Sequence, residues 1–166
     1  LIPTFYNKNY IQAEIKNQIF KNYNINIKFN GGIDYGLLPK PHFYTKNLSI
    51  VKNGKEIGNT EILKVFIGLK NLFSIDNISM KDLIFYKTEF NLYSEDLIFF
   101  QNLLKIEPNE NEIKFKKSNI FLRNKNDELL FIHKINNSRF YYDSKNLQNV
   151  LTSNSEIFNV PIKINV

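Results

Sequence analysis

The stretch from Ile25 to Leu69 constrains the fold most, because three strand-like runs follow one another there with only turns between them. In the first run, Ile25, Ile27 and Phe29 alternate with polar residues, which is the period of a strand with one buried face. A Gly-Gly pair, a Pro-Lys-Pro corner and Asn53-Gly54 separate the runs, and each favours a turn. Strands joined by short turns predict an antiparallel meander.

Two helices are predicted beside these strands. Residues 6–23 place apolar side chains at spacings of three and four, and Asn7 can cap the first turn. The second helix starts at Ser94, with Glu95 and Asp96 near the positive end of its dipole. The expected apolar stripe of the first helix is Tyr10, Ile11, Ile15, Ile19, Phe20 and Tyr23. The expected shared face of the second is Leu97, Phe100, Gln101 and Leu104.

The remaining segments return to the strand period, and short polar turns separate them. A slip in alternation between Met80 and Leu83 predicts a β-bulge. No crossover helix is expected between strands. The predicted fold class is therefore α+β and mostly β, with an N-terminal amphipathic helix followed by an antiparallel meander that forms a curved, groove-like sheet. The 166 residues form a single domain or a fragment of a longer chain, with a helix and first meander over 1–106 and a further β repeat over 107–166.

The composition argues against nucleic-acid binding and against sites that depend on cysteine. The net charge is +6, but the lysines are dispersed among acids, and Arg123 and Arg139 are the only arginines. Because proteins usually bind the phosphates of nucleic acids through clustered arginines, no nucleic-acid partner is expected. The chain has no cysteine, which excludes disulfides and cysteine-based zinc sites.

No catalytic motif is recognisable. His42 and His133 are the only histidines, and neither has a partner at metal-ligand spacing. We expect His42, beside Pro41 at the start of a strand, to be a surface or corner residue, and His133 to have a structural role within an apolar strand. The sequence also lacks a phosphate loop, a dinucleotide fingerprint and a nucleophile elbow. The sequence therefore predicts a protein that is not an enzyme and holds no cofactor or metal.

Several strands carry apolar residues on both faces, which exceeds what one helix can cover. Ile62 and Phe66 oppose the side that holds Leu63, Val65 and Ile67. Either a second layer packs on these strands, or one face lines something apolar.

The order of elements resembles the N-terminal region of the AsmA-like family of bacterial envelope proteins. The likeness covers roughly residues 1–92, and the opening Leu1-Ile2-Pro3 looks like the end of the family's membrane anchor. The helix that follows looks like the family's first helix. The matching strand and corner motifs are Ile25–Asn30, Gly32-Ile33, Pro39-Lys40-Pro41 and Asn47-Leu48-Ser49-Ile50. Two later matches are Leu63–Leu69 and Leu72-Phe73-Ser74-Ile75-Asp76-Asn77-Ile78.

This resemblance implies a periplasmic protein anchored in the bacterial inner membrane, with a role in phospholipid transport and outer-membrane biogenesis. Relatives of this kind carry acyl chains in an apolar β-groove, and the first helix would plug one end of it. The anchor itself would lie outside this sequence. The groove residues expected here are Leu48, Ile50, Leu63, Val65, Ile67 and Leu69. The alternative is a β-sandwich binding or adhesion module of the cell envelope, in which a second sheet closes the apolar face.

Overall fold

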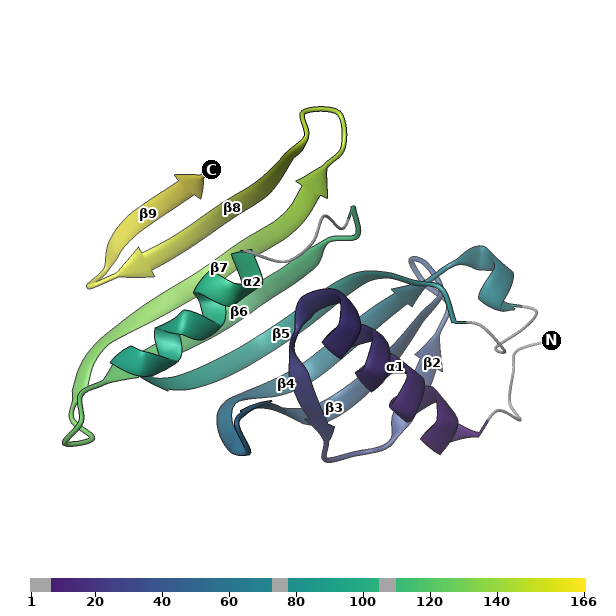
Figure 1. Ribbon diagram of the computed structural model, residues 1–166, viewed down its shortest axis with the longest axis horizontal. Helices are drawn as coiled ribbons and strands as arrows, with labels where there is room; N and C mark the ends of the chain where they lie inside the picture. The colour runs from purple at the N-terminus through teal and green to yellow at the C-terminus, as the bar shows by residue number, and fades with distance from the viewer. Residues whose placement is uncertain (1–6, 73–77, 105–109) are drawn as a thin grey trace.

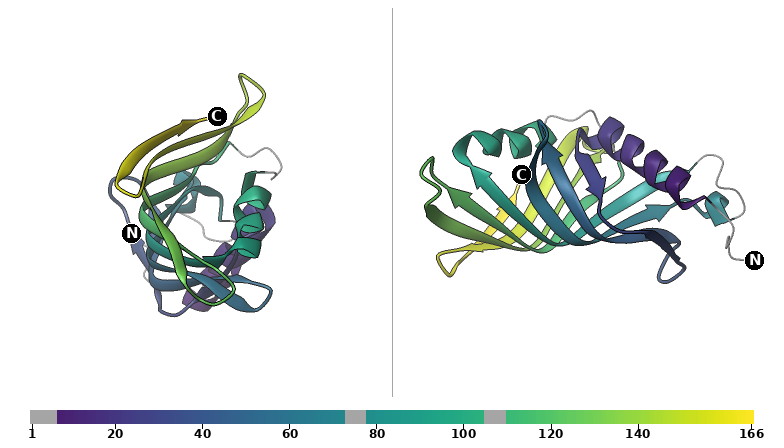
Figure 2. Two further views of the ribbon diagram at one scale, coloured as in Figure 1. Left: turned by 90° about the vertical axis from the view of Figure 1, so that its left-hand side faces the viewer. Right: turned by 90° about the horizontal axis from the view of Figure 1, so that it is seen from below.

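A computed structural model describes residues 7–72, 78–104 and 110–166 of the protein. These residues form one curved nine-stranded sheet, and both helices lie on its concave side (Figures 1 and 2). The strand order is β1-β3-β4-β5-β6-β7-β8-β9, and β2 also pairs with β3. The elements are α1 (Lys8–Tyr23), β1 (Asn26–Phe29), β2 (Ile33–Gly36), β3 (His42–Lys52), β4 (Lys55–Ile67), η1 (Leu69–Leu72), β5 (Met80–Tyr93), η2 (Ser94–Leu97), α2 (Ile98–Leu104), β6 (Ile113–Arg123), β7 (Leu129–Asp143), β8 (Gln148–Ile157) and β9 (Val160–Asn165). The predicted fold class is confirmed.

Helix α1 forms as its pattern predicts. The Asn7 carboxamide oxygen accepts hydrogen bonds from the backbone N–H groups of Asn9 at 3.0 Å and Tyr10 at 3.3 Å, which satisfies donors of the first turn. The helix ends at Asn24, which adopts the left-handed conformation. Tyr10 and Phe20, at the margins of the expected stripe, are substantially exposed. The buried face consists of Ile11, Ile15, Ile19 and Tyr23.

One connection differs from the predicted meander. Strands β5 and β6 are parallel neighbours, with Leu83 paired to Ile113 and Tyr93 paired to Arg123. Parallel neighbours need a connection that returns the chain along the sheet, and η2 and α2 provide it. The expectation of no crossover helix was therefore wrong, because the second predicted helix occupies this connection. The other neighbouring strands are antiparallel.

The buried face of this crossover also differs from the prediction. The first turn is a 3₁₀ helix, which advances by about three residues per turn instead of 3.6 and so shifts the phase of all later side chains. Phe99 and Asp96 are buried as a result, whereas Leu97 and Gln101 are exposed. The Asp96 carboxylate also accepts a hydrogen bond from the backbone N–H of Tyr93, with 3.1 Å between nitrogen and oxygen, as expected for a carboxylate at a helix start.

Local predictions within the described residues also hold. Asn53 and Gly54 both have positive φ angles and close the β3–β4 hairpin. The pairing of β4 with β5 shifts between Leu83 and Met80, where the sequence predicts a bulge. Leu1-Ile2-Pro3 and most of the matching segment 72–78 lie outside the described residues.

A line of left-handed residues crosses the middle of the sheet. Asn47 in β3, Lys87 in β5 and Lys117 in β6 have φ angles of 55°, 53° and 51°. The register pairs skip a position at this line, where Glu61 of β4 faces Asn47 on one side and Lys87 on the other. Each strand thereby changes which alternate residues point inward. In β5 the buried positions change from Leu83 and Phe85 to Thr88, Phe90 and Leu92. The concave face therefore stays continuous on both sides of the line.

Buried hydroxyl groups occupy the concave side of the same line. The hydroxyl oxygens of Thr60 and Thr88 lie 2.9 Å apart, and the Thr88 backbone N–H donates to the Ser118 hydroxyl oxygen at 3.1 Å. Ser118 donates in turn to the Lys116 carbonyl oxygen at 3.2 Å. These bonds satisfy polar groups that would otherwise be costly in the core.

A pair of substitutions tests the left-handed conformation at this line. Lys117→Val should lower the free energy of unfolding by about 1–2 kcal/mol, because a β-branched residue is poorly tolerated at positive φ. Lys116→Val, at an ordinary strand conformation one residue earlier, should be neutral or slightly stabilising, since valine favours strands. Urea unfolding of both variants measures the difference. Equal stability of the two variants would contradict the left-handed conformation of Lys117.

Candidate functional site

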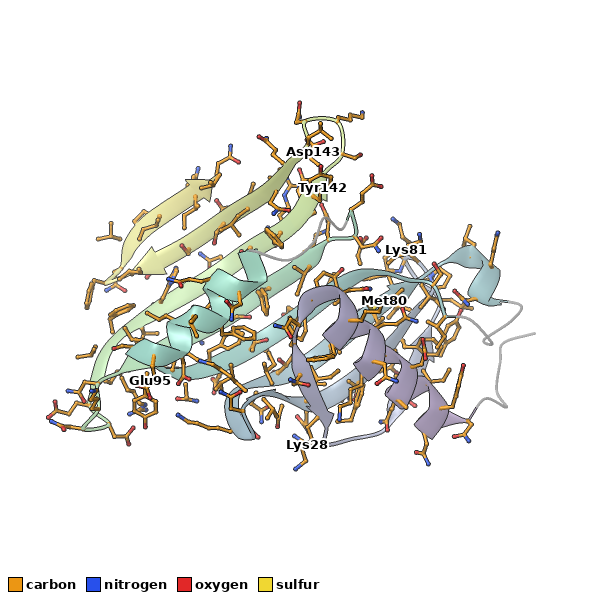
Figure 3. The ribbon with its side chains drawn as sticks, viewed as in Figure 1. Lys28, Met80, Lys81, Glu95, Tyr142 and Asp143 are labelled. Atoms are coloured by element: carbon orange, nitrogen blue, oxygen red, sulfur yellow. The ribbon has the colours of Figure 1, made fainter. Side chains whose placement is uncertain are left out.

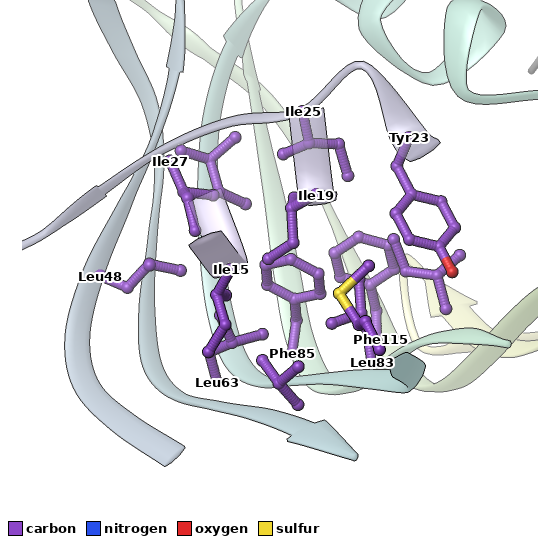
Figure 4. Close-up of a cluster of buried hydrophobic side chains, with 14 of the residues drawn as sticks. Ile15, Ile19, Tyr23, Ile25, Ile27, Leu48, Leu63, Leu83, Phe85 and Phe115 are labelled. Atoms are coloured by element: carbon purple, nitrogen blue, oxygen red, sulfur yellow. The ribbon is translucent and has the colours of Figure 1, made fainter. Parts of the chain in front are cut away.

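The predicted groove residues lie on the concave face, but most of them are not accessible there. Leu48 and Ile50 of β3 and Leu63, Val65 and Ile67 of β4 are all buried. Figure 4 shows Leu48 and Leu63 in one cluster with Ile15 and Ile19 of α1. Helix α1 therefore covers this part of the face, which is hydrophobic core. Leu69 differs, because it lies in η1 with 69% of its surface exposed.

Helix α2 covers the next part of the concave face through aromatic contacts. The Phe90 ring lies 6.1 Å from Phe99 and 5.2 Å from Phe100, measured between centroids. Phe115 continues the cluster at 5.7 Å from Phe90. Such edge and tilted contacts add modestly to the stabilisation from burial.

Asp96 ties the start of the crossover to the β3–β4 hairpin. Its carboxylate lies 3.2 Å from the Lys52 ammonium and 3.6 Å from that of Lys55. Burial alone would raise the pKa of Asp96, but the Tyr93 N–H and the two lysines outweigh burial and hold that pKa below its usual range. The hairpin and the crossover are thereby held together beside the covered part of the face.

Beyond α2 the concave face becomes open, and the exposure of its side chains increases from one strand to the next. Directly paired residues on neighbouring strands share a face, so rows of side chains run across the sheet. One row begins at Leu83 and Ile113, which are fully buried, continues through the nearly buried Phe140 and half-buried Leu151, and ends at Val166. Val166 is 78% exposed. Strands β8 and β9 extend past both helices (Figures 1 and 3).

A second row shows the same gradient. It starts at Phe90 and Ile120, which are buried, passes through His133 and Ile157, which are half-buried, and ends at Val160, which is 59% exposed. We define the open concave surface as the side chains that these two rows, the rows between them and the adjoining Leu122–Phe131 pair place on β7, β8 and β9 outside the core. It comprises Phe131, His133, Leu151, Ile157, Val160, Ile162, Ile164 and Val166.

Small polar residues lie within this apolar surface. Ser153 and Ser155 of β8 are buried, and they pair with Ile164 and Ile162 of β9. On the β7 side they pair with Ser138 and Ile135. The Ser155 hydroxyl donates to the Ile162 carbonyl oxygen at 3.4 Å. The floor of the surface is therefore low at these two positions of β8, with bulkier side chains along β9.

One depression on the convex face is lined by polar side chains whose formal charges cancel. This depression of about 400 Å³ is lined by two lysines, two glutamates and three asparagines, and the Lys87 ammonium lies 2.8 Å from the Glu61 carboxylate. Ile62 and Phe66 are half-buried on this face. Both helices lie on the other side of the sheet, so within the described ranges no second layer covers these two residues (Figure 2).

The two histidines lie on opposite faces of the sheet. His42 is buried on the convex face, where its Nδ1 lies 2.8 Å from the Lys40 carbonyl oxygen and its ring packs against Gly36. His42 begins β3 as expected, but a surface position for it was wrong, because Gly36 has no side chain and leaves room for the ring. His133 lies on the concave face. In the part of the chain that the structure describes, no His, Asp and Glu side chains gather as a metal site.

Neither a scan against protein-family models nor a search of curated proteins finds a match for this chain. The resemblance to the AsmA-like family therefore stays a prediction. Neither α1 nor α2 has the length and apolar character needed to cross a membrane, and the same holds for every helix within the described ranges.

The position of His133 predicts a pH-dependent loss of stability. Burial lowers the pKa of His133, whereas the unfolded chain takes up this proton near pH 6.5. Below that pH the unfolded state therefore binds more protons than the folded state, and stability falls. His133→Phe removes this contribution. The free energy of unfolding of the variant should rise relative to wild type as the pH falls from 7.5 to 5, as measured by urea unfolding. If the two proteins differ in free energy of unfolding by the same amount across this pH range, the burial of His133 is contradicted.

Proposed function

We propose that this protein is a non-enzymatic lipid-binding module that carries phospholipid acyl chains on the open concave surface. The observation that carries the proposal is that the apolar side chains of each row are buried on β5 and become progressively more exposed toward β9. A surface of this kind on a folded protein is typical of a binding site for an apolar partner. Acyl chains fit this chemistry, because they bind by burial and need no directional contacts.

The direction of the rows supports an elongated ligand. The rows run perpendicular to the strands, and neighbouring strands are about 4.8 Å apart, so the three strands β7, β8 and β9 place apolar side chains along a path of about 10 Å. An acyl chain lying along a row contacts one side chain from each strand in turn. Each buried methylene contributes about 0.8 kcal/mol. Binding of this kind needs neither a nucleophile nor a general base.

The two helices give the surface one closed end. Helices α1 and α2 cover the concave side chains of β3–β6, and the apolar surface is exposed only beyond them. A ligand on β7–β9 would therefore meet the Phe90 cluster under α2. This arrangement is compatible with the plug that the resemblance assigns to the first helix.

A β-sandwich module would need a second sheet against the concave face. The described residues form one sheet, and helices occupy the covered part of that face. We therefore favour the lipid-binding proposal over the binding or adhesion module. The cellular setting that the AsmA-like resemblance implies is part of the same proposal. In this setting the protein acts in the periplasm, anchored to the inner membrane, and moves phospholipid toward the outer membrane.

The proposal is tested by native mass spectrometry of the purified chain, followed by extraction and identification of bound lipid. We expect phospholipid to accompany the wild-type protein. Ile164→Asp should reduce bound lipid at least several-fold, since it places a charge in the open concave surface.

Asn165→Asp is the matched control for this substitution. It introduces the same charge on the same strand, at the next residue and on the opposite face. This variant should keep its lipid. Val65 and Ile67 are unsuitable for the test, because both are buried beneath α1 and a carboxylate there would unfold the protein. A folded wild-type protein that neither co-purifies with phospholipid nor takes it up from vesicles would overturn the proposal.

A further inference from the structure

His133 carries a polar atom that the fold leaves unsatisfied. Its Nε2 is buried, and among the residues that the structure describes no hydrogen-bond partner lies within reach of it. Most buried polar side-chain atoms in folded proteins have a partner, and one without a partner costs about 1–3 kcal/mol. An aliphatic or aromatic side chain at this strand position would avoid that cost.

The surroundings of His133 belong to the open concave surface. It is paired with Ile120 of β6 on one side and with Ile157 of β8 on the other, and Phe131 and Ile135 are the next residues of β7 on the same face. Its neighbours are therefore hydrocarbon. In its row it stands between the buried Ile120 and the more exposed Ile157 and Val160. A ligand on the open part of the row would meet the half-buried imidazole at the border of the covered part, and a rotation of the His133 side chain would turn the buried Nε2 toward it.

We infer that the His133 Nε2–H donates a hydrogen bond to the carbonyl oxygen of an ester-linked acyl chain whose hydrocarbon lies along Ile157 and Val160. This inference rests on the proposed function and adds a polar contact to it. A neutral imidazole can carry its proton on Nε2, and an ester carbonyl accepts hydrogen bonds. The contact would fix where along the row the ester group lies, whereas burial of the chain alone is non-directional.

Two ligands that differ by one carbonyl group test this contact. Methyl palmitate and hexadecyl methyl ether have chains of equal length, and each can be titrated against a fluorescent stearate bound to the protein. Wild type should bind the ester about 3- to 10-fold more tightly than the ether, as one net hydrogen bond allows. His133→Phe should bind both ligands equally. His133→Gln retains an N–H donor and should recover part of the preference.

Asn154→Ala, on the neighbouring strand but on the opposite, convex face, is the control and should keep the full preference for the ester. A second readout uses the wild-type protein alone. With only two histidines in the chain, the imidazole nitrogen signals in NMR can be assigned with His133→Phe. The His133 signal should shift with the ester and not with the ether, while the His42 signal on the convex face stays unchanged.

The outcomes separate this inference from the function on which it rests. Equal binding of ester and ether by wild type, or a preference that survives in His133→Phe, overturns the role of His133 and leaves acyl-chain binding in place. A wild-type protein that binds neither ligand and displaces no stearate overturns both. A His133 nitrogen signal unchanged by the ester also overturns the contact.

Discussion

The concave face depends on a change of alternation that occurs at the same level in neighbouring strands. A strand with regular alternation can bury one set of side chains along its whole length. Here Lys87 and Lys117 are left-handed, and the residues after them bury the other set. Because neighbouring strands change together, Thr60, Thr88 and Ser118 meet on the concave side and satisfy one another's hydrogen bonds. Both helices and the open concave surface lie on the face that this line keeps continuous.

The parts of the fold that depend on local chemistry could be predicted from the sequence. The cap at Asn7, the stripe of α1 and the Asn53-Gly54 turn each follow from a few neighbouring residues. The left-handed lysines were missed, because lysine has no preference for that conformation. A signal was present nonetheless. Phe85 and Phe90 are both buried although they are separated by an odd number of positions, which regular alternation does not allow.

None of the predicted groove residues lies in the open concave surface, and the physical reason is different. Alternation shows which side chains share a face, but not what covers that face. Leu63 and Val65 were therefore assigned to the concave side correctly, while the cover that α1 provides depends on tertiary packing. The open surface on β8 and β9 was overlooked because serines interrupt its apolar pattern. Val160, Ile162, Ile164 and Val166, all at alternate positions, are the signal that could have found it.

The parallel pairing of β5 with β6 has a consequence for the order of folding. The hairpins β3–β4, β6–β7, β7–β8 and β8–β9 are each joined by a short turn, so they can close with little loss of chain entropy, whereas a longer segment that includes η1 separates β4 from β5. The β5–β6 pair closes only after the crossover has returned the chain along the sheet, and because the strands are parallel none of its register pairs joins residues that are close in sequence. Before it closes, two separate meanders exist, each with an unpaired edge and exposed phenylalanines. The same pairing that completes the concave face is therefore the step at which a folding chain is most open to association with another copy.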